Sequence, residues 1–193
     1  MFNNFLPEDS EKLKIGLLGG SFNPPHQGHL AISLAVIKKF GLQRVFWLVT
    51  PCNPSKNPQD YLSLEKRVKL CNEIVAKETN LIKILDLEKS AQNYYSATTV
   101  RAIKRFYPKT NFYWIIGGDN LLSFHKWFRW QEIPKQVRLL VCERGSSVLQ
   151  ASRTKVAYHY PLLFEDKKSS KGFFILHQRR NPISSSEIRK GLC

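Results

Sequence analysis

Short apolar runs alternate with helical stretches along most of the chain, and this alternation is the feature that most restricts the fold. Runs this short, ended by Gly or Pro, are typical of strands buried in a parallel sheet. The expected strands are residues 14–18, 44–50, 82–87, 111–116, 137–142 and 173–176. The expected helices are residues 28–40, 62–78 and 96–106, a short helical region up to residue 132, and residues 184–191.

Strands that alternate with helices are joined by right-handed crossovers, which predicts one parallel sheet with helices on both faces. The chain has no internal repeat and no Gly/Ser linker that would divide it. We therefore expect a single doubly wound, Rossmann-like α/β domain over residues 1–193, with residues 1–12 as a loose N-terminal extension. The polar stretch 145–171 has no clear assignment. Ligands of such sheets bind beyond the carboxyl ends of the strands, here at residues 19–29, 51–56 and 117–127.

The segment 19–29 (GGSFNPPHQGH) follows the first expected strand. It is neither a Walker loop nor the GxGxxG dinucleotide pattern. Its two glycines let the backbone approach a phosphate, and the start of the next helix adds a positive field. His26 and His29 lie three residues apart, so both imidazoles can point the same way and donate hydrogen bonds to charge that grows in a transition state. A lone His is more often structural, whereas this pair favours a function.

The charge balance favours anionic partners without choosing among nucleotides, nucleic acid and an acidic membrane surface. Lys and Arg number 30 against 15 Asp and Glu, a net charge of +15, and a generally basic composition explains this equally well. A nucleic-acid-binding protein is the rival from another class, but the chain has no RNP-like motif, zinc knuckle or basic stripe at helical spacing. It also has no signal-peptide pattern at its start and no apolar run near the roughly 20 residues of a spanning helix. We expect a cytoplasmic protein that binds neither nucleic acid nor membrane.

The segment 19–30 (GGSFNPPHQGHL) resembles the HxGH signature of the nucleotidylyltransferase superfamily, in the version of the nicotinate-nucleotide adenylyltransferases. Residues 183–189 (ISSSEIR) are similar to the ISSTxIR box of that superfamily. The resemblance continues in the expected order at residues 51–56, 94–100, 115–127 and 139–145, so it covers nearly the whole chain. It implies transfer of AMP from ATP to nicotinate mononucleotide, giving nicotinate adenine dinucleotide and pyrophosphate in NAD biosynthesis.

The resemblance implies that His29 hydrogen-bonds the α-phosphate of ATP and that His26 assists on the neighbouring phosphates. The implied ATP-binding residues are Gly19, Gly20, Ser21, Phe22, His26, His29, Gly117, Asp119, Ser186 and Arg189. Mg²⁺ would arrive with ATP and keep mostly water ligands, so no metal-binding residue of the protein is expected. Two structural interpretations stay open: Asp119 as a helix cap, either in place of or together with its role as a ribose ligand, and residues 183–189 as a plain capped helix.

The acceptor side of the implied site is formed by Asn53, Lys56, Ser96, Trp127 and Phe128. Trp127 would stack on the pyridine ring, with Ser96 and the backbone N–H of Phe128 at the nicotinate carboxylate. Asn53 and Lys56 would meet the phosphate of the mononucleotide. The alternatives are a core tryptophan and a solvated surface lysine.

Two other acceptors would suit the same fold, nicotinamide mononucleotide and a pantetheine phosphate. The pantetheine enzymes have a TxGH signature, so His26 counts against them, and backbone N–H groups in a positive field favour an acid over an amide. Asn23 stands where many relatives have Asp, and Ser186 where Thr is commoner; both replacements keep a hydrogen-bonding group. The oligomeric state stays open, and a homo-oligomer is compatible with the sequence.

Overall fold

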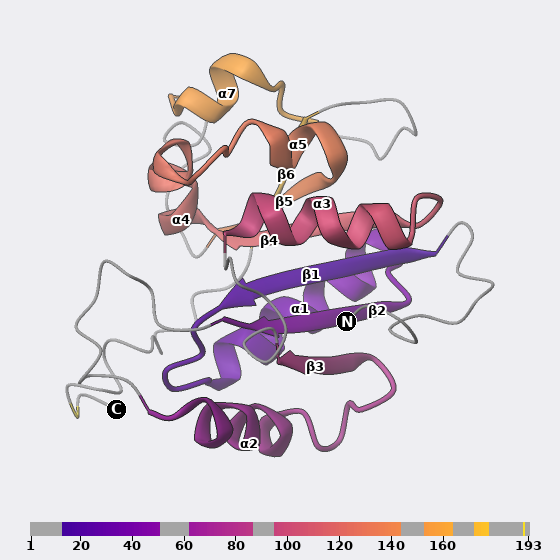
Figure 1. Ribbon diagram of the computed structural model, residues 1–193, viewed down its shortest axis with the longest axis vertical. Coiled ribbons are helices and arrows are strands. Elements are labelled where there is room, and N and C mark those ends of the chain that lie inside the picture. The colour runs from indigo at the N-terminus through magenta and orange to yellow at the C-terminus, as the bar shows by residue number, and fades with distance from the viewer. Residues whose placement is uncertain are drawn as a thin grey trace.

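The computed structural model describes residues 13–50, 62–86, 95–143, 153–163, 172–177 and 191. These residues contain a six-stranded parallel sheet in the order β3-β2-β1-β4-β5-β6 (Figure 1). The strands are β1 (Lys14–Gly20), β2 (Arg44–Val49), β3 (Ile82–Asp86), β4 (Asn111–Gly117), β5 (Arg138–Glu143) and β6 (Phe173–His177). The chain first builds outward from β1 to β3 and then returns to place β4 on the other side of β1. The strand order therefore reverses between β1 and β4, where doubly wound sheets bind their ligands.

Helices cover both faces of this sheet. They are α1 (Gln27–Phe40), α2 (Leu64–Ile74), α3 (Ser96–Phe106), α4 (Gly118–Ser123), the 3₁₀ turn η3 (Phe124–Lys126), α5 (Glu132–Gln136) and α7 (Lys155–His159). In Figure 1, α3 crosses in front of the strands and α1 lies behind them. The helices α1 and α2 share one hydrophobic core with the sheet, while α3, α5 and α7 share the other.

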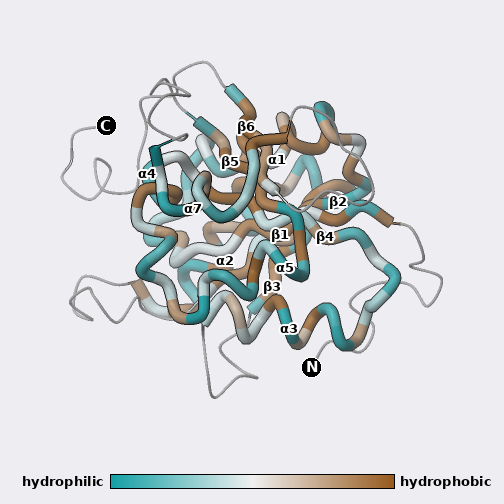
Figure 2. The backbone as a smooth tube through the Cα atoms, turned by 90° about the horizontal axis from the view of Figure 1, so that it is seen from above, coloured by the Kyte–Doolittle hydropathy of each residue, from teal (hydrophilic) through white to brown (hydrophobic). Residues whose placement is uncertain are grey.

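Alternate side chains of each strand enter alternate cores. On β2, Phe46 and Leu48 pack toward α3, whereas Val45, Trp47 and Val49 pack toward α1 and α2. Because both faces are covered, the central strands need no polar face, which explains their continuous apolar runs. Figure 2 shows the same distribution, with hydrophobic segments through the interior and hydrophilic ones toward the periphery.

The expected elements and the observed ones agree closely. All six strands are present within one or two residues of their expected ends, and α3 has the expected bounds. Gly41 ends α1 in the left-handed conformation, with φ of 62°. Helix α2 is shorter than the expected 62–78: Ser63 caps its start by accepting a hydrogen bond from Lys66 N–H, and the buried Val75 is its C-cap.

Helix α7 lies inside the stretch 145–171 that the sequence left unassigned. Nearly all of the expected helix 184–191, and the N-terminal extension 1–12, lie outside the described residues. Within the described part of the chain, no helix has the length and apolar character needed to span a membrane.

Candidate functional site

The turn that follows β1 packs against aromatic side chains. Phe22 has a left-handed backbone with φ of 46°, is 2% exposed, and stacks on Trp47 of β2 with ring centroids 5.0 Å apart at 13°. Gly19 lies against Trp114 of β4, where an added Cβ would come within 3.0 Å of the indole ring. A side chain at position 19 would therefore need the Trp114 ring or the turn to shift by a few tenths of an ångström.

The two histidines begin α1 as a reciprocal cap. His26 is the N-cap residue, with extended backbone, and its Nδ1 accepts a hydrogen bond from Gly28 N–H at 3.1 Å. In return, the backbone N–H of His26 donates to Nδ1 of His29 at 3.2 Å. This is the geometry of a capping box, with histidines in place of the usual Ser or Thr and Glu or Gln. The spacing of three residues in the HxGH pattern is therefore the spacing that this cap requires.

The cap also fixes which nitrogen of each ring carries the proton. Because both Nδ1 atoms accept backbone N–H groups, the neutral form of each imidazole has its proton on Nε2. The two ring centroids are 3.8 Å apart, and His26 is 6% exposed. No acidic residue occupies the first turn of this 14-residue helix. Two uncharged N–H donors thus lie at a helix N-terminus whose dipole favours an anion.

A second layer of contacts supports His29. Ser33 Oγ donates to the backbone carbonyl of His29 at 2.9 Å and accepts from Nε1 of Trp47 at 2.8 Å. The His29 ring lies 4.9 Å from that of Phe22 and 5.8 Å from that of Trp47. The motif is therefore joined to β2 by both a polar chain and an aromatic cluster.

The second expected ATP segment lies at the end of β4. Gly117 ends the strand and holds the N-cap position of α4, so the alternative that Asp119 is the N-cap is wrong. Asp119 is exposed in the first turn, and its carboxylate folds back over Gly117, where any Cβ would collide with it. The carboxylate consequently stays accessible at the carboxyl edge of the sheet.

Sequence reasoning missed Glu143, which ends β5 at the same edge. It is 3% exposed, its Cγ lies beside the α-carbon of Gly118, and its Oε2 is 3.4 Å from Nδ1 of His177 on β6. In the sequence it is one acidic residue at the end of an apolar run, a signal too common to assign a role.

The expected acceptor residues come from two distant segments. Ser96 begins α3, whereas Trp127 and Phe128 follow η3. Tyr95, directly before Ser96, stacks on Phe128 with centroids 4.5 Å apart at 27°, and both rings are nearly half exposed. Trp127 is partly exposed and packs on Phe124 at 5.0 Å. The fold thus places Tyr95, the neighbour of Ser96, against Phe128, and the roles of Ser96, Trp127 and Phe128 stay predictions.

Asn53, Lys56, Ser186 and Arg189 lie outside the described residues, and their roles stay predictions. A further residue without an expected role, Arg67 of α2, is 1% exposed and donates to the Ser21 carbonyl in the turn after β1. A signal for it was present, since Arg67 lies on the apolar stripe of α2 that also carries Cys71. A basic residue on a buried helix face indicates that its side chain is paired with polar groups of the protein.

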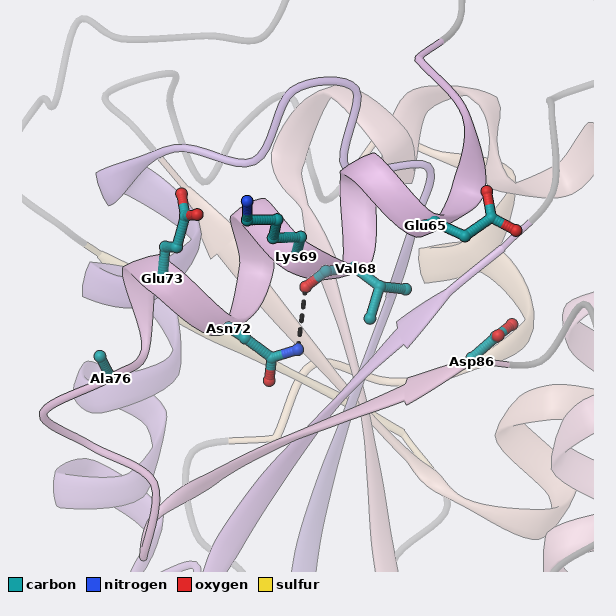
Figure 3. Close-up of a pocket in the computed structure, with 7 residues that line it drawn as sticks. All are labelled: Glu65, Val68, Lys69, Asn72, Glu73, Ala76 and Asp86. Atoms are coloured by element: carbon teal, nitrogen blue, oxygen red, sulfur yellow. Dashed lines mark hydrogen bonds between the residues drawn. The ribbon is translucent and has the colours of Figure 1, made fainter.

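A separate pocket of about 660 Å³ lies beside α2 and β3, away from the histidines. Its lining residues are Glu65, Val68, Lys69, Asn72, Glu73, Ala76 and Asp86. Figure 3 shows Asp86 at the end of β3 and Glu65 near the start of α2. Three carboxylates against one lysine disfavour a phosphate there.

Comparison with known proteins identifies relatives over nearly the full length. The sequence model of the cytidylyltransferase-like family matches residues 17–191. A probable nicotinate-nucleotide adenylyltransferase of Agrobacterium fabrum is 36% identical, over 91% of this chain and 97% of its own length. A protein of the same description from Ruegeria sp. is 37% identical, over 92% and 97%. Among solved structures, Plasmodium falciparum nicotinic acid mononucleotide adenylyltransferase complexed with NaAD has a TM-score of 0.73 at 18% identity, covering 92% of this chain and 83% of that chain, which shows the fold.

Proposed function

Because the chain belongs to the cytidylyltransferase-like family and its curated relatives are nicotinate-nucleotide adenylyltransferases, we propose that it transfers AMP from ATP to nicotinate mononucleotide. A phosphate oxygen of the mononucleotide attacks the α-phosphorus of ATP. The bond from that phosphorus to the oxygen bridging to the β-phosphorus breaks, and pyrophosphate leaves. The product is nicotinate adenine dinucleotide, the deamido precursor of NAD.

The reciprocal histidine cap is the observation that carries this proposal. A phosphate monoester is already an anionic nucleophile at neutral pH, so the reaction needs no general base. Catalysis then consists of positioning and of stabilising charge on the transferred group. Two neutral Nε2–H donors at the start of α1 suit the second task, since preorganised donors need no rearrangement when charge develops.

We assign the part of the site that binds ATP, the donor end, to residues 19–29, to the residues that follow β4, and to residues 183–189. His29 donates to the α-phosphate and His26 to a neighbouring phosphate, while the backbone of Gly19 to Phe22 surrounds them. Asp119 accepts from ribose hydroxyls; its exposed place in the first turn of α4 supports this role. Ser186 and Arg189 hold the β- and γ-phosphates, the latter through a guanidinium fork.

Mg²⁺ fits this site as a companion of ATP. In the described part of the chain, no group of three or more His, Cys, Asp and Glu side chains is arranged to hold a metal ion. Uncharged donors such as His26 and His29 leave the phosphate oxygens anionic and able to bind a hard cation. When bound, Mg²⁺ would neutralise charge on the pyrophosphate that leaves.

We assign the acceptor end to Ser96, Trp127 and Phe128, with Asn53 and Lys56 at the mononucleotide phosphate. The partial exposure of Trp127 supports stacking on the pyridine ring, and the Tyr95–Phe128 contact supports a carboxylate site between Ser96 and the Phe128 backbone. We further propose that residues 1–193 act as one catalytic domain in the cytoplasm.

The reaction is tested by pyrophosphate release from ATP and Mg²⁺, with nicotinate mononucleotide and nicotinamide mononucleotide compared side by side. We expect a strong preference for the acid, and a dinucleotide of the matching mass as product. A preparation of the His29→Ala variant, purified in parallel, controls for contaminating enzymes. Turnover with neither mononucleotide would contradict the assigned acceptor, and a preference for the amide would change the substrate.

A further inference from the structure

A buried arginine joins the ends of two strands at the carboxyl edge of the sheet. Nη1 of Arg67 donates to the carbonyl oxygens of Ser21 and Thr50, each at 2.7 Å, and Nε donates to that of Leu62 at 3.1 Å. Ser21 follows β1, Thr50 follows β2, and Leu62 is the first described residue after 51–61. One guanidinium therefore connects three segments that are separate along the chain.

Two further hydrogen bonds connect the same three segments. The backbone N–H of Leu62 donates to Oδ1 of Asn23 at 3.0 Å, and that of Thr50 donates to the Gly20 carbonyl at 3.0 Å. Asn23 is 3% exposed, so its side chain is committed to the interior. We call Arg67, Asn23 and the backbone groups that they bind the Arg67 clasp.

The chemistry of this corner suits a guanidinium. Its planar fork directs several N–H donors at fixed angles, whereas a lysine ammonium is a compact charge without a preferred plane. Cys71 lies one turn further along α2 and is fully buried, and burial raises the pKa of its thiol to about 12, opposed only in part by the charge of Arg67. Cys71 stays neutral at physiological pH, so the guanidinium is matched to carbonyl dipoles instead of a thiolate.

We propose that Arg67 is a positioning residue that sets the distance between the turn 21–29 and both flanks of segment 51–61. This inference rests on the proposed function, in which the turn holds ATP and the segment supplies Asn53 and Lys56 to the mononucleotide phosphate. An in-line displacement tolerates little error, and a misplacement of about 1 Å costs on the order of 10²-fold in rate. The histidine cap lies within α1 and its N-cap and makes no use of Arg67, so its two bonds remain when Arg67 is replaced.

The test is Arg67→Lys, which keeps the charge and loses the fork. We expect kcat/KM for nicotinate mononucleotide to fall about 10- to 100-fold, with a raised KM for that substrate. The dissociation constant of ATP, measured without the acceptor, should rise less than this KM, because the histidine cap keeps its own bonds although Arg67 also holds the Ser21 carbonyl. Because loss of folded protein lowers kcat without raising one KM alone, the KM change distinguishes positioning from stability.

Cys71→Ala is the matched control, since it opens a cavity in the same helix but removes no bond of the clasp. We expect it to lower Tm and to leave both KM values unchanged. Asn23→Ala removes the bond from Leu62 N–H to Asn23 Oδ1 and carries the test if Arg67→Lys does not fold; its KM for the mononucleotide should rise about three- to tenfold. An unchanged KM in the folded clasp variants, or an equal rise in Cys71→Ala, would overturn the proposal.

Amide hydrogen exchange gives a readout that does not depend on turnover. Arg67→Lys should reduce the protection of the Thr50 and Leu62 amides by about tenfold or more, and Asn23→Ala in its place should do so for the Leu62 amide; both should leave that of Leu17, inside β1, unchanged. If the wild-type protein turns over no mononucleotide, the proposed function fails while the exchange result still decides whether the clasp holds both flanks. Unchanged protection at Thr50 and Leu62 would reject the clasp itself.

Discussion

The two ends of the candidate site are built in different ways. The histidines of the donor end come from one short segment and cap the same helix. Nδ1 of His29 accepts from the backbone N–H of His26, and Nδ1 of His26 accepts from that of Gly28. The proposed acceptor end combines the start of α3 with the segment beyond η3, and the stacked rings of Tyr95 and Phe128 connect the two. One end is therefore determined by local hydrogen bonds and the other by tertiary packing of aromatic side chains.

This difference separates two kinds of catalytic requirement. Donors that stabilise developing charge must already point correctly before the reaction, and a helix cap gives two imidazoles fixed tautomers. In the proposed site the mononucleotide is recognised by stacking of its ring and through its own carboxylate, and such recognition tolerates small movements of the aromatic side chains. We expect changes at the donor end to affect kcat, and changes at the acceptor end to affect the KM of the mononucleotide.

The largest expected effect is that of His29. Replacing it with Ala should lower kcat by roughly 10²–10³-fold, the size typical for loss of one transition-state donor, with ATP binding largely kept. Steady-state pyrophosphate release and ATP binding without acceptor measure the two quantities. Near-normal turnover would remove His29 from the mechanism.

A matched pair of variants separates the two roles of the His29 ring. His29→Asn places an acceptor near the position of Nδ1 and can keep the cap, whereas His29→Gln places a donor near the position of Nε2. We expect Asn to retain Tm and lose rate, and Gln to retain more rate than Asn. The reverse ranking would mean that the cap, not the Nε2 donor, sets the rate.

The fold was predictable because its determinants are local and periodic. The apolar pattern and the flanking breaker residues predict a strand at 44–50 and a helix at 96–106. The structure has them as β2 and α3, respectively. The shortening of α2 was not predictable, since Val75 fits the helical pattern and is buried like Cys71, yet it is the C-cap at which the helix ends. The assignment of α7 likewise needed tertiary contacts, because its five residues are too few to show a period.

The candidate site likewise contains residues that the sequence could predict and residues that it could not. The histidine pair could be found from spacing alone, and the residues of the acceptor end only through the family resemblance. The sequence shows Arg67 only as a basic residue on the apolar stripe of α2 and Glu143 only as an acidic residue at the end of an apolar run, and their partners lie in distant segments, such as the Ser21 carbonyl or Gly118. A sequence pattern does not contain those contacts.

An intermediate effect is expected at Trp127, where the acceptor end would be weakened. Trp127→Ala should raise the KM of nicotinate mononucleotide about tenfold or more, since stacking of a ring on an aromatic side chain contributes roughly 1–3 kcal/mol. The KM of ATP should change little. Trp130→Ala is the control, because Trp130 contacts Phe124, His159 and Tyr160 within the protein and should lower Tm without a selective KM effect. Equal changes in both KM values for Trp127→Ala would reject its stacking role.

The smallest expected effect tests whether the donor end is as local as its hydrogen bonds indicate. Ser33→Ala breaks the chain from Trp47 Nε1 through Ser33 Oγ to the His29 carbonyl and leaves a buried indole N–H without this acceptor, at a cost of about 1–3 kcal/mol in stability. Because both cap bonds remain, kcat should stay within about threefold of the wild-type value. Ser63→Ala, which removes the N-cap of α2 at a cost of about 1 kcal/mol, is a control for lowered stability elsewhere. If Ser33→Ala lowers kcat as strongly as His29→Ala while the protein stays folded, the imidazoles depend on β2 for their orientation, and the contrast between a local donor end and a tertiary acceptor end is wrong.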